Sequence, residues 1–292
     1  MNSRNRLFLS FVLITIFSGC DIWTDKPGRT DEIFVSSFNL LRTSPDQGTM
    51  TNNVNEVWVY SETDVLGVFP IPASFPFIAD QSEGGSEITI LAGIRVNGIS
   101  ATRKPYPFYE AMKLQLANLP GGDEYYTEFN SNYIESAQII LAEDFESANR
   151  FETSNTSTAE VVRTVDPDWV FEGVASGLIL LSEEESHITS TTQEQLYNLP
   201  QSGPIFLEFN YRCDNSFAVG LEAFGGNNPQ RTPIIVLNPT GEEWKKMYLD
   251  LGPFVFSTPS AFGYELTLDA ILDLGEETGY VVVDNFKIVH YK

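Results

Sequence analysis

Hydrophobic and polar positions alternate along most of the chain, and turn residues interrupt the alternation every few residues. Val57 and Val59, for example, alternate with Trp58 and Tyr60. The same pattern recurs in four further segments of the first half: 66–70, 87–91, 112–116 and 125–129. Short alternating segments between Gly, Pro, Asn and Asp residues are typical of half-buried strands. The pattern therefore predicts an all-β sandwich over residues 32–138.

A second series of strands follows residue 139. We expect strands at 160–164, 177–181, 205–212, 217–223, 233–237, 246–251 and 280–289. Only two short segments, 191–199 and 267–274, favour a helix, and the sequence has no heptad run or internal repeat. Residues 139–292 are therefore predicted to form a second β-sandwich, which agrees with the number of domains expected for a chain of 292 residues.

The first twenty residues depart from this pattern. Arg4 and Arg6 precede an uncharged apolar run from Leu7 to Phe17, which ends at Ser18, Gly19 and Cys20. A basic start, about 7–15 apolar residues and small residues at the cleavage site describe a secretory signal peptide. The run is too short for a membrane-spanning helix, which needs about 20 residues.

The end of this run resembles the lipobox of bacterial lipoproteins, in which small residues precede the cysteine. The resemblance implies that residues 1–19 are removed as a signal peptide and that Cys20 is diacylated and becomes the N-terminus. Residues 20–31, which have little periodicity, then form a lipidated tether. Phe17 stands where the lipobox usually has leucine. The alternative is an ordinary signal peptide followed by an incidental cysteine.

The charge of the chain narrows the choice of partners. It has 17 basic and 40 acidic side chains and a formal net charge of −23. A surface of this charge repels nucleic acids and anionic lipid headgroups, which excludes both as partners and favours cations and neutral ligands. The hydrophobic content of 42% is sufficient for real cores, so a disordered stalk is excluded.

Eight short motifs follow one another along the chain. They are Val57–Tyr60, Leu66–Pro70, Ala92–Ile99 and Tyr106–Tyr109 in the first half, and Glu143–Glu146, Phe171–Gly177, Glu243–Leu251 and Val283–Lys287 in the second. In this order they resemble an uncharacterised group of Bacteroidetes-type lipoproteins. The resemblance covers nearly the whole chain after Cys20. It implies an Ig-like or transthyretin-like sandwich followed by a jelly-roll of the galactose-binding or carbohydrate-binding-module type, and none of the motifs is catalytic.

The sequence offers little for catalysis. Its two histidines are His187, in a charged segment expected to be a loop, and His290, on the last expected strand. There is no Gly-x-Ser-x-Gly motif, no His/Cys cluster with zinc spacing and no Gly-rich phosphate loop. Cys213 stands alone in an alternating segment and is interpreted as a core residue. We predict that the protein is not an enzyme, although its many carboxylates leave a glycosidase pair open.

One set of acidic residues has a specific interpretation. In jelly-rolls the first and last strands commonly lie side by side, which would bring Asp144 and Glu146 near Asp284 and Asn285. Oxygen ligands that converge from two strands suit calcium, which takes about six to eight of them. Asp144, Glu146 and Asp284 are therefore candidate ligands of a structural calcium ion, and the alternative is ordinary strand-end charges. No other cofactor is expected.

Sugar binding is expected to use exposed aromatic faces with polar groups beside them. The candidates are Trp169, Tyr211, Phe224 and Tyr264. Trp169 leads them because Asp-Pro-Asp-Trp at 166–169 is typical of an exposed turn. Trp244 is expected instead to be a core anchor.

Three hypotheses follow for function. The first is a non-enzymatic, lipid-anchored protein of the cell envelope that binds a polysaccharide through its jelly-roll. The second is a structural or interaction subunit that docks with an envelope protein, and the third is a glycan hydrolase. The expected location is the outer membrane, to which the lipid attaches the protein. Because Asp21 follows the cysteine, retention in the inner membrane is the alternative.

Overall fold

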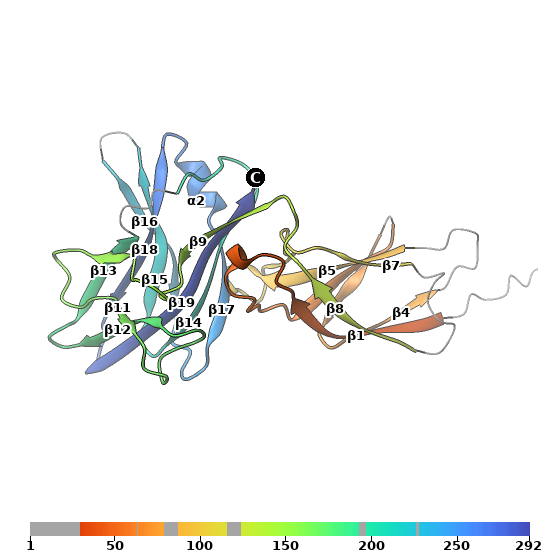
Figure 1. Cartoon of the computed structure of the whole chain (residues 1–292), viewed down its shortest axis with the longest axis horizontal. Helices are drawn as coiled ribbons and strands as arrows, with labels where there is room; N and C mark the ends of the chain where they lie inside the picture. Colours follow the sequence, from red (N-terminus) through yellow and green to blue (C-terminus); the bar gives the residue numbers. More distant parts are fainter. Residues whose placement is uncertain (1–29, 63, 79–86, 116–123, 193–196, 226–227) are drawn as a thin grey trace, which may run out of the picture.

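The computed structural model describes residues 30–62, 64–78, 87–115, 124–192, 197–225 and 228–292 (Figure 1). Almost all regular elements in these residues are strands, so the prediction of an all-β chain built from β-sandwiches is confirmed. No described helix is long and apolar enough to cross a membrane. The predicted signal peptide and Cys20 lie outside the described residues, and lipidation stays a prediction.

The first sandwich consists of two facing sheets (Figure 1). One has the order β4 (Ala73–Ile78), β1 (Thr30–Leu40) and β8 (Glu124–Ser131). The other has the order β3 (Val65–Pro70), β2 (Glu56–Tyr60), β5 (Glu87–Arg95) and β6 (Arg103–Pro105), with β7 (Met112–Gln115) also paired to β5. Every second residue of a strand points to the same face. Ile33, Val59 and Ile90 accordingly turn inward from β1, β2 and β5 and are fully buried.

The second sandwich also has two sheets, which we name by their place relative to the first (Figure 1). The proximal sheet has the order β11 (Val162–Thr164), β12 (Ser176–Ser182), β19 (Thr278–Tyr291), β14 (Ile205–Cys213) and β17 (Lys245–Asp250). The distal sheet, on the side away from the first sandwich, has the order β10 (Phe151–Thr153), β13 (His187–Thr192), β18 (Gly263–Ile271), β15 (Phe217–Phe224) and β16 (Gln230–Leu237).

The strand β9 (Ala137–Glu143) opens the second sandwich and pairs with the last strand, β19. β12 pairs with the preceding part of β19, so β9 and β12 lie along one edge of that strand. The expected juxtaposition of the first and last strands is therefore confirmed. Asn285, with a φ of 58°, lies in β19 between these two partners, next to an irregularity of the register.

Helices are few and short in the described residues. α2 spans Gly252–Ser257, and the 3-10 turns η1 and η2 span Pro45–Gln47 and Val96–Gly98. The helical expectation for 191–199 and 267–274 is wrong where the structure tests it, because Thr191 of β13 pairs with Thr267 of β18 in an antiparallel ladder. His187 begins β13 and does not lie in a loop.

The core of the second sandwich lies between the proximal and distal sheets. Phe209 and Phe286 stack with ring centroids 5.0 Å apart and are almost completely buried. Cys213 is fully buried in the same cluster, which confirms its interpretation as a core residue. Burial raises the pKa of its thiol to about 11, so the thiol stays protonated at neutral pH.

The outer face of the proximal sheet packs against the first sandwich. Phe206, Tyr248 and Val289, from β14, β17 and β19, belong to the same apolar cluster as the core of the first sandwich. The ring of Tyr106 in the first sandwich lies 5.3 Å from that of Phe206 and 5.0 Å from that of Tyr248, measured between centroids. The two sandwiches thus share an apolar interface.

A buried ionic group, which we call the Glu208 cluster, lies in the same interface. Oε2 of Glu208 is 3.2 Å from Nζ of Lys246 and 3.6 Å from Nζ of Lys287. Its Oε1 accepts hydrogen bonds from the hydroxyls of Tyr106 (2.6 Å) and Tyr133 (2.9 Å) in the first sandwich. Burial acts to raise the pKa of the Glu208 carboxyl, but the two ammonium groups and the hydroxyls outweigh it and hold the pKa below its ordinary value.

Candidate functional site

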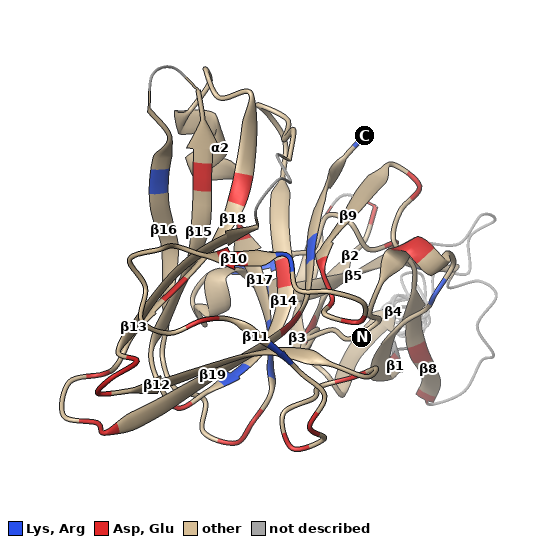
Figure 2. Cartoon of the chain, turned by 60° about the vertical axis from the view of Figure 1, so that its left-hand side comes forward, with Lys and Arg blue, Asp and Glu red and all other residues tan. Residues whose placement is uncertain are grey.

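The distal sheet has an outer face that the first sandwich does not cover (Figure 1). Because Leu221 of β15 and Leu266 of β18 turn into the core, their neighbours along each strand face outward. Strand pairing then places Arg231, Glu222 and Glu265 in one row across β16, β15 and β18. Figure 2 shows this row as one basic and two acidic positions side by side.

Arg231 links the strands of this face. Its Nη1 lies 3.2 Å from Oε2 of Glu222, and its Nη2 lies 2.5 Å from Oδ1 of Asp269. Nη2 also donates a hydrogen bond to the carbonyl of Ser190 (2.9 Å). The guanidinium therefore reaches from β16 to groups on β15, β18 and β13. We call Glu222, Arg231, Glu265, Thr267 and Asp269 the polar face.

The middle of the polar face is buried although it faces outward. Glu265 is 9% exposed and Thr267 is 1% exposed. The Oγ1 of Thr267 has no hydrogen-bond partner within the described residues. The pKa of the Glu265 carboxyl is raised above its ordinary value, mainly by burial. A hydrogen bond from Thr191 opposes this rise, and the charge of neighbouring Glu222 adds to it. Unpaired buried polar groups and like charges opposite each other across a ladder both destabilise a sheet, so this arrangement lowers the stability of the distal sheet.

The chemistry of the polar face suits hydroxyl groups. Its three carboxylates accept hydrogen bonds, and the guanidinium of Arg231 donates them. A hydroxyl can do both. The excess of carboxylates repels an anionic ligand. The face therefore fits an uncharged ligand that carries several hydroxyl groups.

None of the residues of the polar face was expected from the sequence, because strand pairing brings them together from three different strands. One signal could have shown part of it. In β18, Glu265, Thr267 and Asp269 alternate with apolar residues, which is the period of a strand with one polar face.

The aromatic candidates divide between the core and the surface. Tyr211 is 6% exposed and Tyr264 is 1% exposed, and both belong to the core of the second sandwich. The expectation that these two rings contact a ligand is therefore wrong. Phe224 is half-buried and lies on the outer face of β15, two residues beyond Glu222. It borders the polar face.

Trp169 lies on another surface, beside Arg212 of β14. The Cζ atom of Arg212 is 5.2 Å from the centroid of the Trp169 ring, 5.4 Å from that of Trp244 and 5.9 Å from that of Tyr280. We call these four residues the Arg212 cluster. Trp244 is half-buried here and is absent from the described core, so the expectation of a core anchor is wrong.

The three candidate calcium ligands each have protein partners. Both carboxylate oxygens of Glu146 accept hydrogen bonds from the backbone N–H of Val174 (3.0 and 3.2 Å), and Oδ1 of Asp144 accepts one from the N–H of Glu146 (3.2 Å). Oδ2 of Asp284 accepts one from the hydroxyl of Ser176 (2.8 Å). Burial raises the pKa of the Asp284 carboxyl to about 7, against the effect of this hydrogen bond.

A small cavity brings part of this set together. It has a volume of about 240 Å³, and Asp144, Glu146, Glu172 and Asn285 are among its lining residues. Within the described ranges, no group of three or more His, Cys, Asp or Glu side chains is placed to hold a metal ion. Calcium binding stays a prediction.

The calcium prediction can be tested by thermal unfolding. A ligand that binds only the folded state stabilises it by about 2.7 kcal/mol at a hundredfold excess over its Kd. We expect the melting temperature to rise with calcium and to fall again with a chelator, and we expect no rise in Asp144→Asn. Magnesium serves as the control ion. A melting temperature that is the same with calcium and with chelator would contradict calcium binding.

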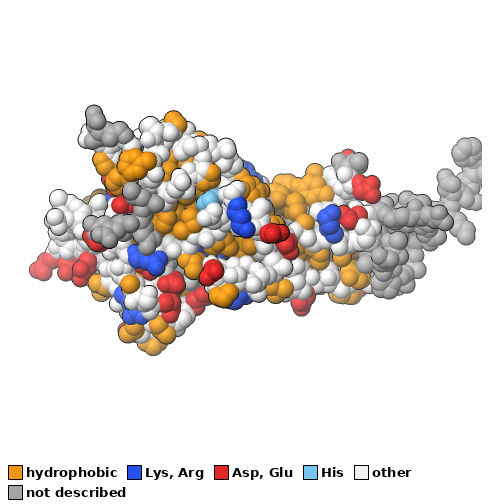
Figure 3. Space-filling view, turned by 45° about the horizontal axis from the view of Figure 1, so that its top comes forward, with side chains coloured by type: hydrophobic (Ala, Val, Ile, Leu, Met, Phe, Trp, Pro, Cys, Tyr) orange, Lys and Arg blue, Asp and Glu red, His pale blue; other side chains and the backbone are white. Residues whose placement is uncertain are grey.

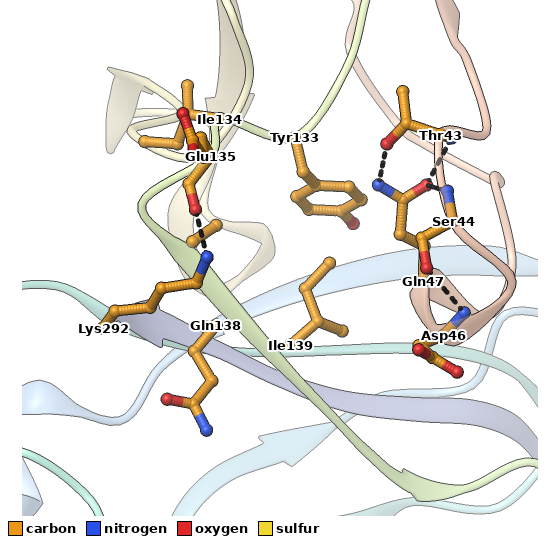
Figure 4. A pocket seen from close by; sticks show the side chains of 11 residues that line it. Thr43, Ser44, Asp46, Gln47, Tyr133, Ile134, Glu135, Gln138, Ile139 and Lys292 are labelled. Carbon is orange, nitrogen blue, oxygen red and sulfur yellow. Dashed lines mark hydrogen bonds between the residues drawn. The ribbon is translucent and has the colours of Figure 1, made fainter.

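A larger cavity, of about 590 Å³, opens at the seam between the two sandwiches (Figure 4). The ring of Tyr133 and the side chain of Ile139 lie in its middle, and Lys292 donates a hydrogen bond to the carbonyl of Glu135 (2.6 Å). The amide of Gln47 is engaged with Thr43 and Ser44 on the opposite wall. Much of the polar lining is therefore already paired within the protein.

Comparison with known proteins finds solved structures that are similar to this chain. No family model matches the chain, and no curated protein is similar to it. The family 30 carbohydrate-binding module of a Clostridium thermocellum cellulosomal cellulase is 13% identical, with 52% of this chain and 96% of that chain covered and a TM-score of 0.40. The CBM22-2 xylan-binding domain of Paenibacillus barcinonensis Xyn10C is 16% identical, with 50% and 96% covered and a TM-score of 0.35.

A third similar structure is TmCBM61 in complex with β-1,4-galactotriose. It is 15% identical, with 50% of this chain and 92% of that chain covered and a TM-score of 0.33. At these identities and TM-scores, the likenesses carry no conclusion about what this chain binds.

Proposed function

We propose that the protein is a non-catalytic glycan-binding protein and that the polar face of its second sandwich is the binding surface. The observation that carries the proposal is the position of Arg231. Its guanidinium joins Glu222 and Asp269 across an outer face on which Thr267 has an unpaired hydroxyl within the described residues. The guanidinium and the carboxylates supply donors and acceptors of the kind that the hydroxyls of a sugar chain need.

The charge of the face selects the class of glycan. Arg231 is surrounded by Glu222, Glu265 and Asp269, and the whole chain has a net charge of −23. This negative charge would repel polysaccharides that carry carboxylates or sulfates. The proposed ligand is therefore a neutral polysaccharide.

The arrangement of the molecule fits a protein that presents this face away from a membrane. β1 begins at the end of the first sandwich that is farthest from the second (Figure 1). A lipid on Cys20, at the start of the proposed tether, would attach the protein at that end. We propose that the protein is a lipoprotein of the outer membrane and that the first sandwich acts as a spacer.

The buried interface favours a second candidate function, a rigid structural subunit of an envelope complex. The Glu208 cluster and the apolar contacts of Tyr106 join the two sandwiches through a buried interface. A large continuous apolar patch would mark a docking surface for another protein. On the face that Figure 3 shows, apolar side chains form separate patches among charged ones, which favours glycan binding over this alternative.

Affinity electrophoresis of the whole protein tests the proposal. Its migration in native gels is compared with and without cellulose derivatives, xylan, galactan, alginate and pectin. We expect at least one neutral polysaccharide to retard the protein, and alginate and pectin to have no effect. Retardation only by the acidic polymers, or by none, would contradict the proposal.

The same polysaccharides test the absence of catalysis. We expect no release of reducing ends during incubation with the protein. Glu222 and Glu265 are directly opposite each other on adjacent strands, so they are the carboxylates that a hydrolase would use here. Cleavage by the wild type that is lost in Glu265→Gln would contradict the proposal and support the hydrolase hypothesis.

A further inference from the structure

The Arg212 cluster exposes an aromatic surface on the opposite side of the second sandwich from the polar face. Trp169, Trp244 and Tyr280 are each half-buried, so part of every side chain remains accessible to solvent. Leu180, directly opposite Tyr280 on β12, is 50% exposed, and Val165 is 61% exposed. Aromatic and apolar groups are therefore accessible together beyond the interface with the first sandwich.

Backbone groups hold the turn that carries Trp169 and the ring of Tyr280. The N–H of Trp169 donates a hydrogen bond to the carbonyl of Asp166 (2.9 Å), and the hydroxyl of Tyr280 donates one to the carbonyl of Gly241 (3.1 Å). The rings of Trp169 and Tyr280 meet edge to face, with centroids 4.9 Å apart. A surface that is ordered in advance loses little conformational entropy when it binds a ligand.

Arg212 supplies polar groups at the same place. Its Nη2 donates a hydrogen bond to the carbonyl of Asp168 (2.5 Å). Its Nε is buried and has no hydrogen-bond partner in the part of the chain that the structure describes. A buried donor without a partner is rare in native structures. Asp166 and Asp168 are exposed beside the rings and add carboxylate acceptors.

We propose that the Arg212 cluster is a second saccharide-binding site. The C–H face of a sugar ring packs on Trp169, and its hydroxyls pair with Arg212 and with the carboxylates of Asp166 and Asp168. The inference rests on the proposed function, because the ligand is the same neutral glycan. A sugar fits better than a protein segment. Its small apolar face matches the rings of the cluster, and the hydroxyls along its edge match the charged groups beside them.

Two sites on opposite sides of one sandwich would have a consequence for affinity. When both sites bind the same polysaccharide, or neighbouring polysaccharide chains, the overall avidity exceeds the affinity of either site alone. Short oligosaccharides, which reach only one site at a time, are expected to bind with a stoichiometry of two.

Titration calorimetry with cellohexaose, xylohexaose and β-1,4-galactotriose tests the proposal. For the sugar that binds, we expect a stoichiometry of two for the wild type and of one for Trp169→Ala. Arg212→Met, which removes the guanidinium and keeps much of the side-chain volume, is the second variant and is also expected to show a stoichiometry of one. Circular dichroism during thermal unfolding verifies that both variants are folded.

The outcomes separate this inference from the proposed function. A stoichiometry of one that is unchanged in both variants overturns the second site and leaves the polar face as the binding surface. A single site that is lost in Trp169→Ala or Arg212→Met overturns the polar face as the binding surface and leaves the cluster. Absence of binding for all three sugars overturns both.

Discussion

Replacement of Glu208 by glutamine is expected to lower the free energy of unfolding by about 3–5 kcal/mol. Glutamine keeps an oxygen for the hydroxyls of Tyr106 and Tyr133, but it leaves Lys246 and Lys287 buried without the carboxylate that pairs with both of them. Removing one partner of a buried ionic group lowers the free energy of unfolding by far more than the intact group contributes to it, because the remaining charges stay desolvated. Chemical denaturation at neutral pH measures the change.

An exposed ion pair in the first sandwich provides the control. Nζ of Lys113 lies 2.8 Å from Oε1 of Glu87, with 63% and 28% of the two side chains exposed. Glu87→Gln removes a charge of the same kind and is expected to cost about 1 kcal/mol or less. If Glu208→Gln costs no more than Glu87→Gln, the Glu208 cluster does not hold the two sandwiches together.

Replacement of Gly220 by valine is expected to destabilise the second sandwich by about 1–3 kcal/mol and to abolish binding at the polar face. A Cβ atom on Gly220 would lie 2.2 Å from the carbonyl oxygen of Thr232 and 2.8 Å from Cα of Pro233. Both are backbone atoms of β16, so this strand has to move away from β15. Arg231 precedes Thr232 and would move with it.

Ala218→Val is the matched control for this change, because Ala218 lies on the same face of β15 two residues earlier and is half-exposed. It is expected to leave both stability and binding nearly unchanged. Thermal unfolding and affinity electrophoresis of the two variants measure the effects. Binding by Gly220→Val as strong as that of the wild type would show that the register of β15 and β16 does not matter for the site.

Strands β14 and β15 could be predicted from the sequence, whereas β13, which has polar inward residues, could not. β14 and β15 lie close to their expected places, 205–212 and 217–223, because their inward positions are consistently apolar. β13 was missed because Ser190 and Thr192 are buried. Their hydroxyls pair with the backbone of β18, through the carbonyl of Leu268 and the N–H of Leu266. Such pairing satisfies a polar residue in a core but hides the strand from a hydrophobicity pattern.

Strand parity decides which of the aromatic candidates are buried. Tyr264 has the same parity as Leu266 in β18, and Tyr211 has the same parity as Phe209 in β14, so both rings turn inward. Their neighbours Glu265 and Arg212 turn outward and belong to the two proposed sites. A shift of one residue along a strand exchanges the core face for the outer face. Aromatic character alone therefore could not identify the binding residues.

The sites themselves depend on contacts that the sequence does not encode locally. The carboxylates around Arg231 come from β15 and β18, and only the ladder register makes Glu222 and Glu265 neighbours. The Arg212 cluster likewise joins rings from segments more than 30 residues apart along the chain. Of these residues, only Trp169 was expected, from the turn that contains it.

Titration calorimetry of Arg231→Lys tests whether the polar face binds a neutral glycan. Lysine keeps the positive charge but cannot bridge Glu222 and Asp269 with a planar fork. The substitution is made in a Trp169→Ala background, so that only the polar face is measured. Arg103→Lys is the control, because Arg103 is a half-exposed arginine paired with Glu56 in the first sandwich (3.4 Å).

We expect Arg231→Lys to lower the affinity of the Trp169→Ala protein for its neutral oligosaccharide at least about tenfold, or by about 1.4 kcal/mol. We expect no change with Arg103→Lys. Equal affinity of the Arg231→Lys protein and its parent for that oligosaccharide would contradict binding at the polar face.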